Sequence, residues 1–556
     1  MRVRSPRSAG LLAAAMLSAA ALGAGAGCGR QQAGDGPDGG GSRARADRAR
    51  QVAVAWDGSR AAATWRAGYH PMGEVVRTPR GGLHGSAEMQ LLGEHQQCLD
   101  LVPLQHEPPC PPVFPTRARC RAAADHRALR TAVRGPVILP DDPGFDEARR
   151  PWNLAVEQPV AAVVEAADAD DVAALVRHAR STGTGIATQP NGHGATGRTA
   201  GCILLRTGRL DALEIDPVRR RPRVGAGVPS GRVQAAAARH GLTGLPGSSP
   251  VVSVAGVALG GGLSWFGRKF GWVADSVTAF DIVDAEGEQR RVTGDSDPDL
   301  FWGLRGGGGD LAVVTALELA LHPAPELYGG RVLWAAEHAG AVLEVYRQLT
   351  AAAPDELTLW FDLLHFPGAA PMVAVDATHL GAEREAKGLL GPLDGLPRPL
   401  SDSRSVMPVS ALGSITAEPT EPGAGLSRGE LLTALDEQAA GAFLAEPVAP
   451  LLSVQVRHLG GALAQPSGSP HGPLTEPYAL YLFGVPTDPV AAEAVTTKQR
   501  ALAEALPVSG RAPLSFLAPG EAIEKALPPA ALDRIRALKH HRDPDRLFRS
   551  NFPLLP

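Results

Sequence analysis

The sequence of 556 residues has only five lysines, five cysteines and 5% aromatic residues. Its formal net charge is −4, so it lacks a general electrostatic attraction for nucleic acid. It contains no P-loop lysine and no H-E-x-x-H pair, which argues against the P-loop nucleotidases and zinc metalloproteases that depend on them. The absence of any C-x-x-C pair argues against a zinc site. The length indicates two or more domains.

The first 28 residues have the layout of a secretory signal, with the basic segment MRVRSPR followed by an apolar run that ends in small residues. We predict a signal peptide over 1–28 and a disordered linker over 29–50, whose Gly-rich, charged composition cannot bury a core. Two outcomes stay open. Lipid modification of Cys28 would tether the protein outside the cytoplasmic membrane, whereas cleavage near residue 27 would release it.

Residues 51–135 form a predicted N-terminal extension of unknown role, with alternating patterns that indicate a few strands. An exported protein can form disulfides, and Cys98, Cys110 and Cys120 lie close together in a Pro-rich stretch. One local bridge among these three is expected, and its pairing stays open.

An α/β pattern begins near residue 151. A buried-type strand over 159–166 precedes a helix that Asp168 caps and Gly183 ends, and a second strand follows over 185–189. This strand leads into the loop QPNGHGATG, residues 189–197. Its glycines have the G-x-G-x-x-G spacing of a dinucleotide-binding Rossmann unit, and a histidine lies among them.

The residues after this loop exclude the Rossmann interpretation. A Rossmann loop opens a helix at once, but Gly197 is followed by a turn, an apolar strand over 203–206 and another strand that ends at Asp216. The glycines can still bring backbone N–H groups against a phosphate. Two further Gly-rich blocks lie at 244–277 and 303–321. Three such loops predict a large, elongated ligand that contains a diphosphate.

Several ordered motifs resemble those of berberine-bridge-enzyme-like flavoproteins, in the vanillyl-alcohol-oxidase superfamily with a PCMH-type FAD-binding domain. The matching segments are QPNGHGATG, the V-G-A-G at 224–227, VSVAGVALGGG at 252–262, LFWGLRGGGGD at 300–310, VRHLGGAL at 456–463 and HHRDPDRLFRSNFPLL at 540–555. The resemblance implies an α+β fold. It comprises a two-part FAD-binding domain over 151–325, a substrate-binding domain with a helix-covered antiparallel sheet over 326–505, and a C-terminal segment over 506–556 that returns to the FAD domain.

In this family the histidine of the first loop bonds covalently to the 8α-methyl carbon of FAD, and His193 occupies that position. Some members add a second bond through a cysteine, where this chain has Ser249, so the resemblance implies a single link. The cofactor-binding residues that it implies are His193, Pro190, Asn191, Gly192, Gly194, Ala195, Gly197, Gly227, Ser249, Val254, Gly256, Gly260, Gly261, Gly262, Val313 and Asn551.

The chain also departs from the family pattern. Asn191 replaces a glycine of the first loop, and residues 310–312 read Asp-Leu-Ala instead of Asn-Phe-Gly. Near the end, Pro513 and Ser515 stand where members carry a Tyr and an Asn that serve the active site. The catalytic base is therefore unassigned. Tyr478, Tyr481, His458, His365 and Asp362 fall in the substrate region and are each interpreted as strand or surface residues.

The signal-like N-terminus implies export, and the resemblance implies an oxidoreductase with covalent FAD that oxidises an alcohol, sugar or secondary metabolite and passes the electrons to O2. Two alternatives stay open: a non-catalytic flavin-binding protein, and a dehydrogenase that uses another acceptor. The expected partners are a small-molecule substrate and O2, with neither nucleic acid nor metal.

Overall fold

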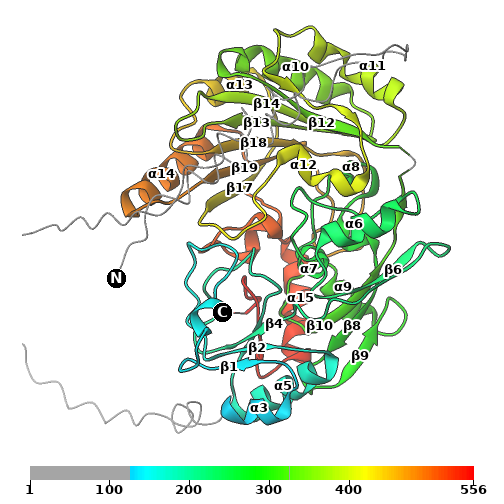
Figure 1. Ribbon diagram of the computed structural model, residues 1–556, viewed down its shortest axis with the longest axis vertical. Helices are drawn as coiled ribbons and strands as arrows, with labels where there is room; N and C mark the ends of the chain where they lie inside the picture. The colour runs from blue at the N-terminus through cyan, green and yellow to red at the C-terminus, as the bar shows by residue number, and fades with distance from the viewer. Residues whose placement is uncertain (1–125, 325, 556) are drawn as a thin grey trace, which may run out of the picture. The chain divides into compact units, whose positions relative to one another are not determined.

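The computed structural model describes residues 126–324 and 326–555, and all of them belong to one of the two compact units of the chain (Figure 1). The expected signal peptide, the linker, residues 51–125 of the extension and four of the five cysteines lie outside the described residues. Cys202 is buried and not bonded to another cysteine. The fold is α+β, as expected.

The first sheet is mainly parallel and contains the chain end. Asp168 caps helix α5 (Ala169–Thr182) by accepting the N–H groups of Asp170 and Asp171, and Gly183 ends it with φ +67°. Both helix limits confirm the sequence prediction. The strands, in spatial order, are β1 (Val137–Ile138), β2 (Ala162–Glu165), β4 (Ile203–Arg206), β3 (Ile186–Thr188) and β20 (Phe548–Arg549).

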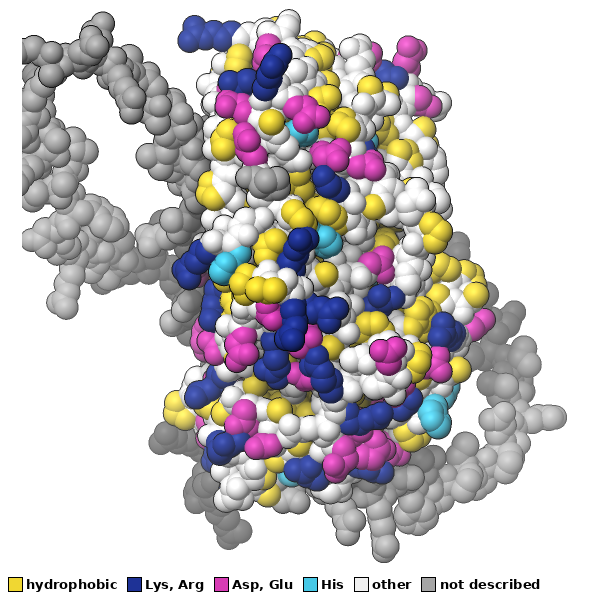
Figure 2. Space-filling view, turned by 90° about the vertical axis from the view of Figure 1, so that its right-hand side faces the viewer, with side chains coloured by type: hydrophobic (Ala, Val, Ile, Leu, Met, Phe, Trp, Pro, Cys, Tyr) yellow, Lys and Arg dark blue, Asp and Glu magenta, His cyan; other side chains and the backbone are white. Residues whose placement is uncertain are grey.

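The second sheet is antiparallel. Its strands, in spatial order, are β5 (Leu213–Asp216), β6 (Arg221–Gly225), β10 (Val313–Leu319), β8 (Val277–Val283) and β9 (Gln289–Val292). The basic run 219–223 begins in the turn between β5 and β6 and continues into β6, which starts at Arg221. Arg223 and Arg291 reach from β6 and β9 to Asp281 of β8 at 2.7 and 3.1 Å. Such pairing agrees with Figure 2, where basic and acidic side chains interleave on the face shown.

The third sheet is large and antiparallel. Its strands, in spatial order, are β15 (Ser401–Asp402), β12 (Tyr328–Ala335), β14 (Met372–His379), β13 (Leu357–Leu364), β18 (Ser453–His458), β19 (Tyr478–Gly484) and β17 (Leu426–Leu432), and β16 (Ser405–Val406) also pairs with β12. Alternate apolar residues pack one face against helices (Figure 1). These helices are α10 (Ala339–Ala352), α11 (Glu383–Asp394), α13 (Glu437–Leu444) and α14 (Pro489–Ala505).

The opposite face of the third sheet packs against the part of the chain that contains the first and second sheets. The rings of Trp360 in β13 and Trp265 stack at 3.5 Å, and Trp360 belongs to the hydrophobic core that includes residues of the first two sheets.

The remaining elements are α3 (Leu129–Ala132), α4 (Phe145–Ala148), α6 (Ser230–Ala238), β7 (Leu242–Thr243), α7 (Val254–Leu259), α8 (Gly267–Phe270), α9 (Pro298–Leu304), β11 (His322–Pro323), α12 (Gly413–Thr416) and α15 (Pro529–Arg542). Within the described residues, no helix has the length and apolar character needed to cross a membrane.

A buried network fastens the C-terminal tail. The ammonium group of Lys539 in α15 donates to the Asp310 carbonyl at 2.6 Å, the Asp543 carboxylate at 2.6 Å and the Phe548 carbonyl at 2.9 Å. The two carboxylate oxygens of Asp310 accept the N–H groups of Ser550 and Leu554, each at 2.7 Å. A carboxylate offers two such acceptors and an amide only one, which explains why this chain carries Asp at 310.

The substitution Lys539→Met should destabilise the protein by about 3–5 kcal/mol, because it leaves the buried Asp543 carboxylate without its cation. Urea unfolding followed by tryptophan fluorescence measures the loss. Lys387→Met is the control, since Lys387 is exposed and forms a surface ion pair with Glu383, and it should leave the midpoint unchanged. Equal midpoints for the two variants would contradict this role for Lys539.

Candidate functional site

The loop over 189–197 joins β3 to β4 and depends on glycine at two positions. Gly192 and Gly197 both have φ +79°, a conformation that other residues rarely adopt. A Cβ atom at Gly192 would lie 3.0 Å from Pro151, and one at Gly197 would lie 2.9 Å from the Glu157 carbonyl. The loop backbone therefore packs closely against residues 151–157.

His193 is half-buried on this loop and contacts an aromatic ring and an amide side chain. The Trp152 ring stacks on the imidazole at 4.1 Å with the two planes 15° apart. Asn191 Oδ1 lies 2.9 Å from His193 Nδ1. Burial lowers the pKa of His193 to about 4, so its imidazole is neutral at physiological pH.

The C-terminal tail reaches the same loop. Thr196 donates its hydroxyl hydrogen to the Asn551 carbonyl at 2.9 Å, and Gln189 Nε2 lies 3.4 Å from Asn551 Oδ1. The structure thus brings together His193 and Asn551, two predicted site residues that are 358 positions apart in the sequence. The second glycine block also contacts the first loop, because the Val251 carbonyl accepts the side-chain N–H of Asn191 at 2.9 Å.

Two glycines of the later Gly-rich blocks lie against His471. Gly261 and Gly306 have φ +84° and +108°, and Cβ atoms added to them would lie 2.4 and 2.7 Å from the His471 ring. Trp272 stacks on this ring at 4.8 Å. Burial lowers the pKa of His471 to about 4, and its Nε2 has no hydrogen-bond partner within the described part of the chain. His471 could not be predicted from the sequence, because a single histidine in a Ser- and Pro-rich loop belongs to no recognisable motif.

Three predicted residues occupy packing positions. Val254 begins α7 and Val313 begins β10, and both side chains belong to the hydrophobic core. Gly227 lies where a Cβ would be 2.2 Å from the Thr207 carbonyl, so it permits two chain segments to cross. Whether the backbone at these three positions contacts a cofactor stays a prediction, as it does for the rest of the predicted set.

The segment with the unexpected Pro513 and Ser515 connects both domains. Ser515 Cβ lies 3.7 Å from the Cβ position of Gly260, and Phe516 Cβ lies 2.5 Å from that of Gly429 in β17. The 3₁₀ turn Leu514–Phe516 therefore lies between a glycine loop and the third sheet.

The sheet face beside this turn carries polar side chains. Register pairs Trp360 with Arg457 and Asp362 with Gln455, so these four residues share the face turned away from the helices. The Arg457 guanidinium lies 4.0 Å from the Trp360 ring and 5.2 Å from the Phe516 ring, and its Nε donates to Gln455 at 2.6 Å. Arg457 makes no ion pair within residues 126–324 and 326–555.

The sequence candidates in the substrate region divide between the two faces. Asp362 and Tyr481 lie on this polar face, where burial raises the pKa of Asp362 to about 7. Tyr478 packs against the helix-side core, and His458 lies 2.9 Å from the buried guanidinium of Arg268. The His365 backbone N–H binds the Leu452 carbonyl. Tyr478 and His458 thus have structural contacts.

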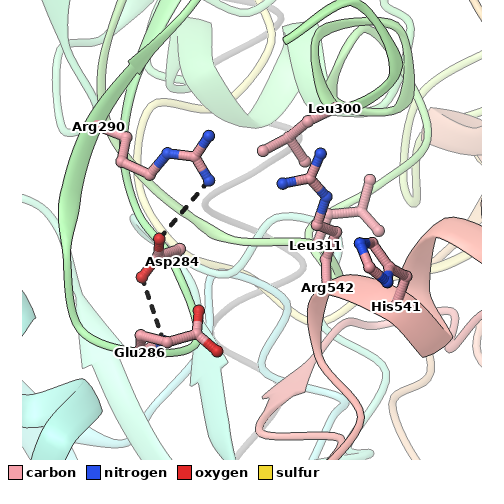
Figure 3. Close-up of a pocket in the computed structure, with 7 residues that line it drawn as sticks. All are labelled: Asp284, Glu286, Arg290, Leu300, Leu311, His541 and Arg542. Carbon is pink, nitrogen blue, oxygen red and sulfur yellow. Dashed lines mark hydrogen bonds and ion pairs between the residues drawn. The ribbon is translucent and has the colours of Figure 1, made fainter.

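A cavity of about 200 Å³ lies elsewhere, between the β8–β9 turn and the end of α15 (Figure 3). Arg290 points toward Asp284 at 3.7 Å, and both Arg290 and Arg542 pair with Asp297. Both guanidinium groups that line the cavity therefore already have carboxylate partners. None of the predicted cofactor-binding residues lines it, so it is a poor candidate for the diphosphate site. No cluster of metal-ligating side chains occurs among the described residues.

The first loop and its surroundings fit a ligand with many hydrogen-bonding groups. Gln189 Oε1, Thr199 Oγ1 and Ser550 Oγ are buried and have no partner in the described structure. Buried polar atoms usually find a partner, so their position beside the glycine loop and the tail is consistent with a bound cofactor. The residues present therefore fit FAD.

Comparisons with known proteins agree with this site. A family described as FAD binding domain matches residues 160–293. (R)-6-hydroxynicotine oxidase of Paenarthrobacter nicotinovorans is 33% identical over 301 residues, 52% of this chain, and the match spans 65% of that relative's length. The crystal structure of 6-hydroxy-D-nicotine oxidase from Arthrobacter nicotinovorans aligns with TM-score 0.67 and 26% identity over 76% of this chain and 98% of its own.

A third similarity concerns the fold alone. BBE-like 1 of Physcomitrella patens aligns with TM-score 0.68 and 16% identity, over 78% of this chain and all of its own length. The FAD-type domain, the helix-covered sheet and the returning tail are thus common to a group of proteins with distant sequences. The chain thus contains a FAD-binding domain, and in sequence and fold it is similar to FAD-linked oxidoreductases that include 6-hydroxy-D-nicotine oxidase.

Proposed function

We propose that this protein is an exported oxidoreductase that holds FAD through a single covalent bond to His193. It oxidises a C–H bond beside oxygen or nitrogen in an alcohol, sugar or secondary metabolite, and O2 accepts the electrons. Export leaves it either secreted or anchored outside the cytoplasmic membrane through Cys28. The observation that carries this proposal is the neutral imidazole of His193, held on a glycine loop that the C-terminal tail also reaches.

Bound FAD supplies the acceptor for a hydride. His193 contributes a nitrogen lone pair for the covalent bond, because burial keeps the imidazole unprotonated. The glycines at 192 and 197 let backbone N–H groups approach the diphosphate. Ser249 has no thiol, so the chain offers no second attachment at that position.

The polar face of the third sheet supplies groups for a substrate. Trp360, Tyr481 and Phe516 surround the Arg457 guanidinium and limit the access of water to it. The pKa of Asp362 near 7 lets this carboxyl group hold or release a proton at neutral pH. The relative that is 33% identical is named for oxidising a hydroxynicotine, which supports a C–H bond beside nitrogen as one substrate class.

Two alternatives have specific support. Pro513 and Ser515 stand where other members have active-site Tyr and Asn residues, which favours a non-catalytic flavin-binding protein. A dehydrogenase with an acceptor other than O2 uses the same cofactor site, so that site does not distinguish it from an oxidase.

Acid precipitation tests the covalent bond. Wild-type protein should give a yellow pellet, and His193→Ala should give a colourless pellet with any flavin in the supernatant. His240→Ala is the matched control, because His240 is exposed beyond α6, and its pellet should stay yellow. A colourless wild-type pellet with FAD in solution would contradict the bond, and a folded protein with no flavin at all would contradict the function.

Turnover separates the three functions. Purified protein with a full complement of flavin should release hydrogen peroxide with at least one member of a panel of alcohols, sugars and cyclic amines. Dye reduction under nitrogen without peroxide release in air would identify a dehydrogenase. No detectable activity in either assay would favour the non-catalytic protein.

Covalent incorporation should depend weakly on pH. With its pKa near 4, His193 stays neutral and reactive as the pH falls from 8 to 5, so the rate should change less than about two-fold. A histidine with the ordinary pKa of about 6.5 would lose roughly thirty-fold in its neutral form at pH 5. Mixing flavin-free protein with FAD and following fluorescence of the denatured protein measures the rate. A steep fall between pH 7 and 5 would contradict the buried, neutral state.

A further inference from the structure

Two arginines lie on the polar face of the third sheet, and only one of them has a direct carboxylate partner. Register places Arg331, Asp376 and Arg457 in one row across β12, β14 and β18. Arg331 donates to both oxygens of Asp376, at 2.6 and 2.7 Å. Burial lowers the pKa of Arg457, and Glu418, the carboxylate that opposes this effect most, forms no ion pair with it. The face therefore carries one guanidinium without a direct counter-ion among the described residues.

The terminal nitrogens of Arg457 are free to bind a ligand. Its Nε donates to Gln455 Oε1 at 2.6 Å, which fixes the guanidinium against the strand. Its two Nη groups form no hydrogen bond with a described residue, and they are not among the buried unpartnered atoms, so they remain accessible. Four of the five N–H groups are thus available. They form the end of a planar fork that matches the two oxygens of a carboxylate.

Three aromatic rings enclose this guanidinium. Its carbon lies 4.0 Å from the centre of the Trp360 ring, 5.2 Å from that of Phe516 and 5.6 Å from that of Tyr481. The rings limit the access of water, which strengthens the attraction for an anion bound there. They also offer apolar area on which a carbon skeleton can pack. This composition favours an organic anion over a small inorganic one.

Arg457 also lies near a segment that is predicted to bind the cofactor. The Phe516 ring beside the guanidinium follows Ser515 in the chain, and Ser515 Cβ lies 3.7 Å from the Cβ position of Gly260. One 3₁₀ turn, Leu514–Phe516, therefore connects the surroundings of Arg457 to the second glycine block. A ligand held by Arg457 lies on the side of the sheet that faces this block, as a substrate has to.

We propose that Arg457 binds a carboxylate group of the substrate, and that the substrate is an alcohol, sugar or amine with a carboxylate on a ring-shaped skeleton, such as a uronic acid or an aromatic acid. This inference rests on the proposed function. A neutral substrate would cover the half-buried Arg457 and leave its charge without a partner, which is costly. A carboxylate supplies that partner through charge-assisted hydrogen bonds.

Calorimetric titration of the flavin-loaded protein tests the charge preference without requiring turnover. The probes are two pairs of similar skeleton: benzoate with benzamide, and galacturonate with galactose. In at least one pair the carboxylate should bind about ten-fold or more tightly than its neutral partner, as expected for charge-assisted hydrogen bonds. Equal binding within both pairs, or binding by neither carboxylate, would overturn the inference. A carboxylate preference in a protein that oxidises nothing would contradict the proposed function and leave anion binding in place.

Substitution assigns the preference to Arg457. The ratio of the two affinities in a pair should fall to near one in Arg457→Met. In Arg457→Lys, which keeps the charge without the fork, the ratio should lie between this value and that of the wild type, and this variant serves if Arg457→Met does not fold. The matched control is Arg500→Met, which removes an exposed charge from α14 and should leave the ratio unchanged.

Three results would overturn the role of Arg457. The first is a wild-type ratio in both of its variants, and the second is an equal loss in Arg500→Met. The third is a shifted visible spectrum of the bound flavin with an unchanged ratio, which would place the guanidinium against the cofactor instead of the substrate. Loss of active protein alone does not alter the ratio, so a merely structural role would leave it unchanged.

Discussion

The buried ammonium group of Lys539 supports the arrangement on which the cofactor site depends. Strand β20 has only two residues, and pairing of that length cannot hold a chain end in place. Lys539 adds bonds to the Asp310 and Phe548 carbonyls and to Asp543, and Asp310 binds the tail backbone further along. Asn551 follows at once, so this network brings the tail to the loop that carries His193.

The two sides of the site differ in their electrostatics. The pKa of His193 is low because of burial, and no charged partner contributes to it. The polar sheet face contains a guanidinium at Arg457 among aromatic rings and a carboxyl at Asp362 whose pKa burial raises. The surroundings of His193 thus contribute no charge, whereas the polar sheet face carries charged groups.

Sequence patterns predicted those features that depend on neighbouring residues. The Asp168 cap, the Gly183 terminus and strand 203–206 appear where the patterns place them, because capping and burial periodicity act over a few residues. The block 244–277 was harder to interpret. It contains helices α7 and α8, and small residues carry too little hydrophobic periodicity to reveal a helix.

By itself, the sequence determined the glycine loops and the position of His193, since these features follow from ordered local motifs. Only the tertiary structure decided what surrounds them. Trp152 stacks on His193, Val251 orients the Asn191 amide, and His471 covers two glycines from 165 residues or more away. These contacts join segments that are remote along the chain, and their geometry arises from packing of whole sheets. The surroundings of His193 depend on that packing.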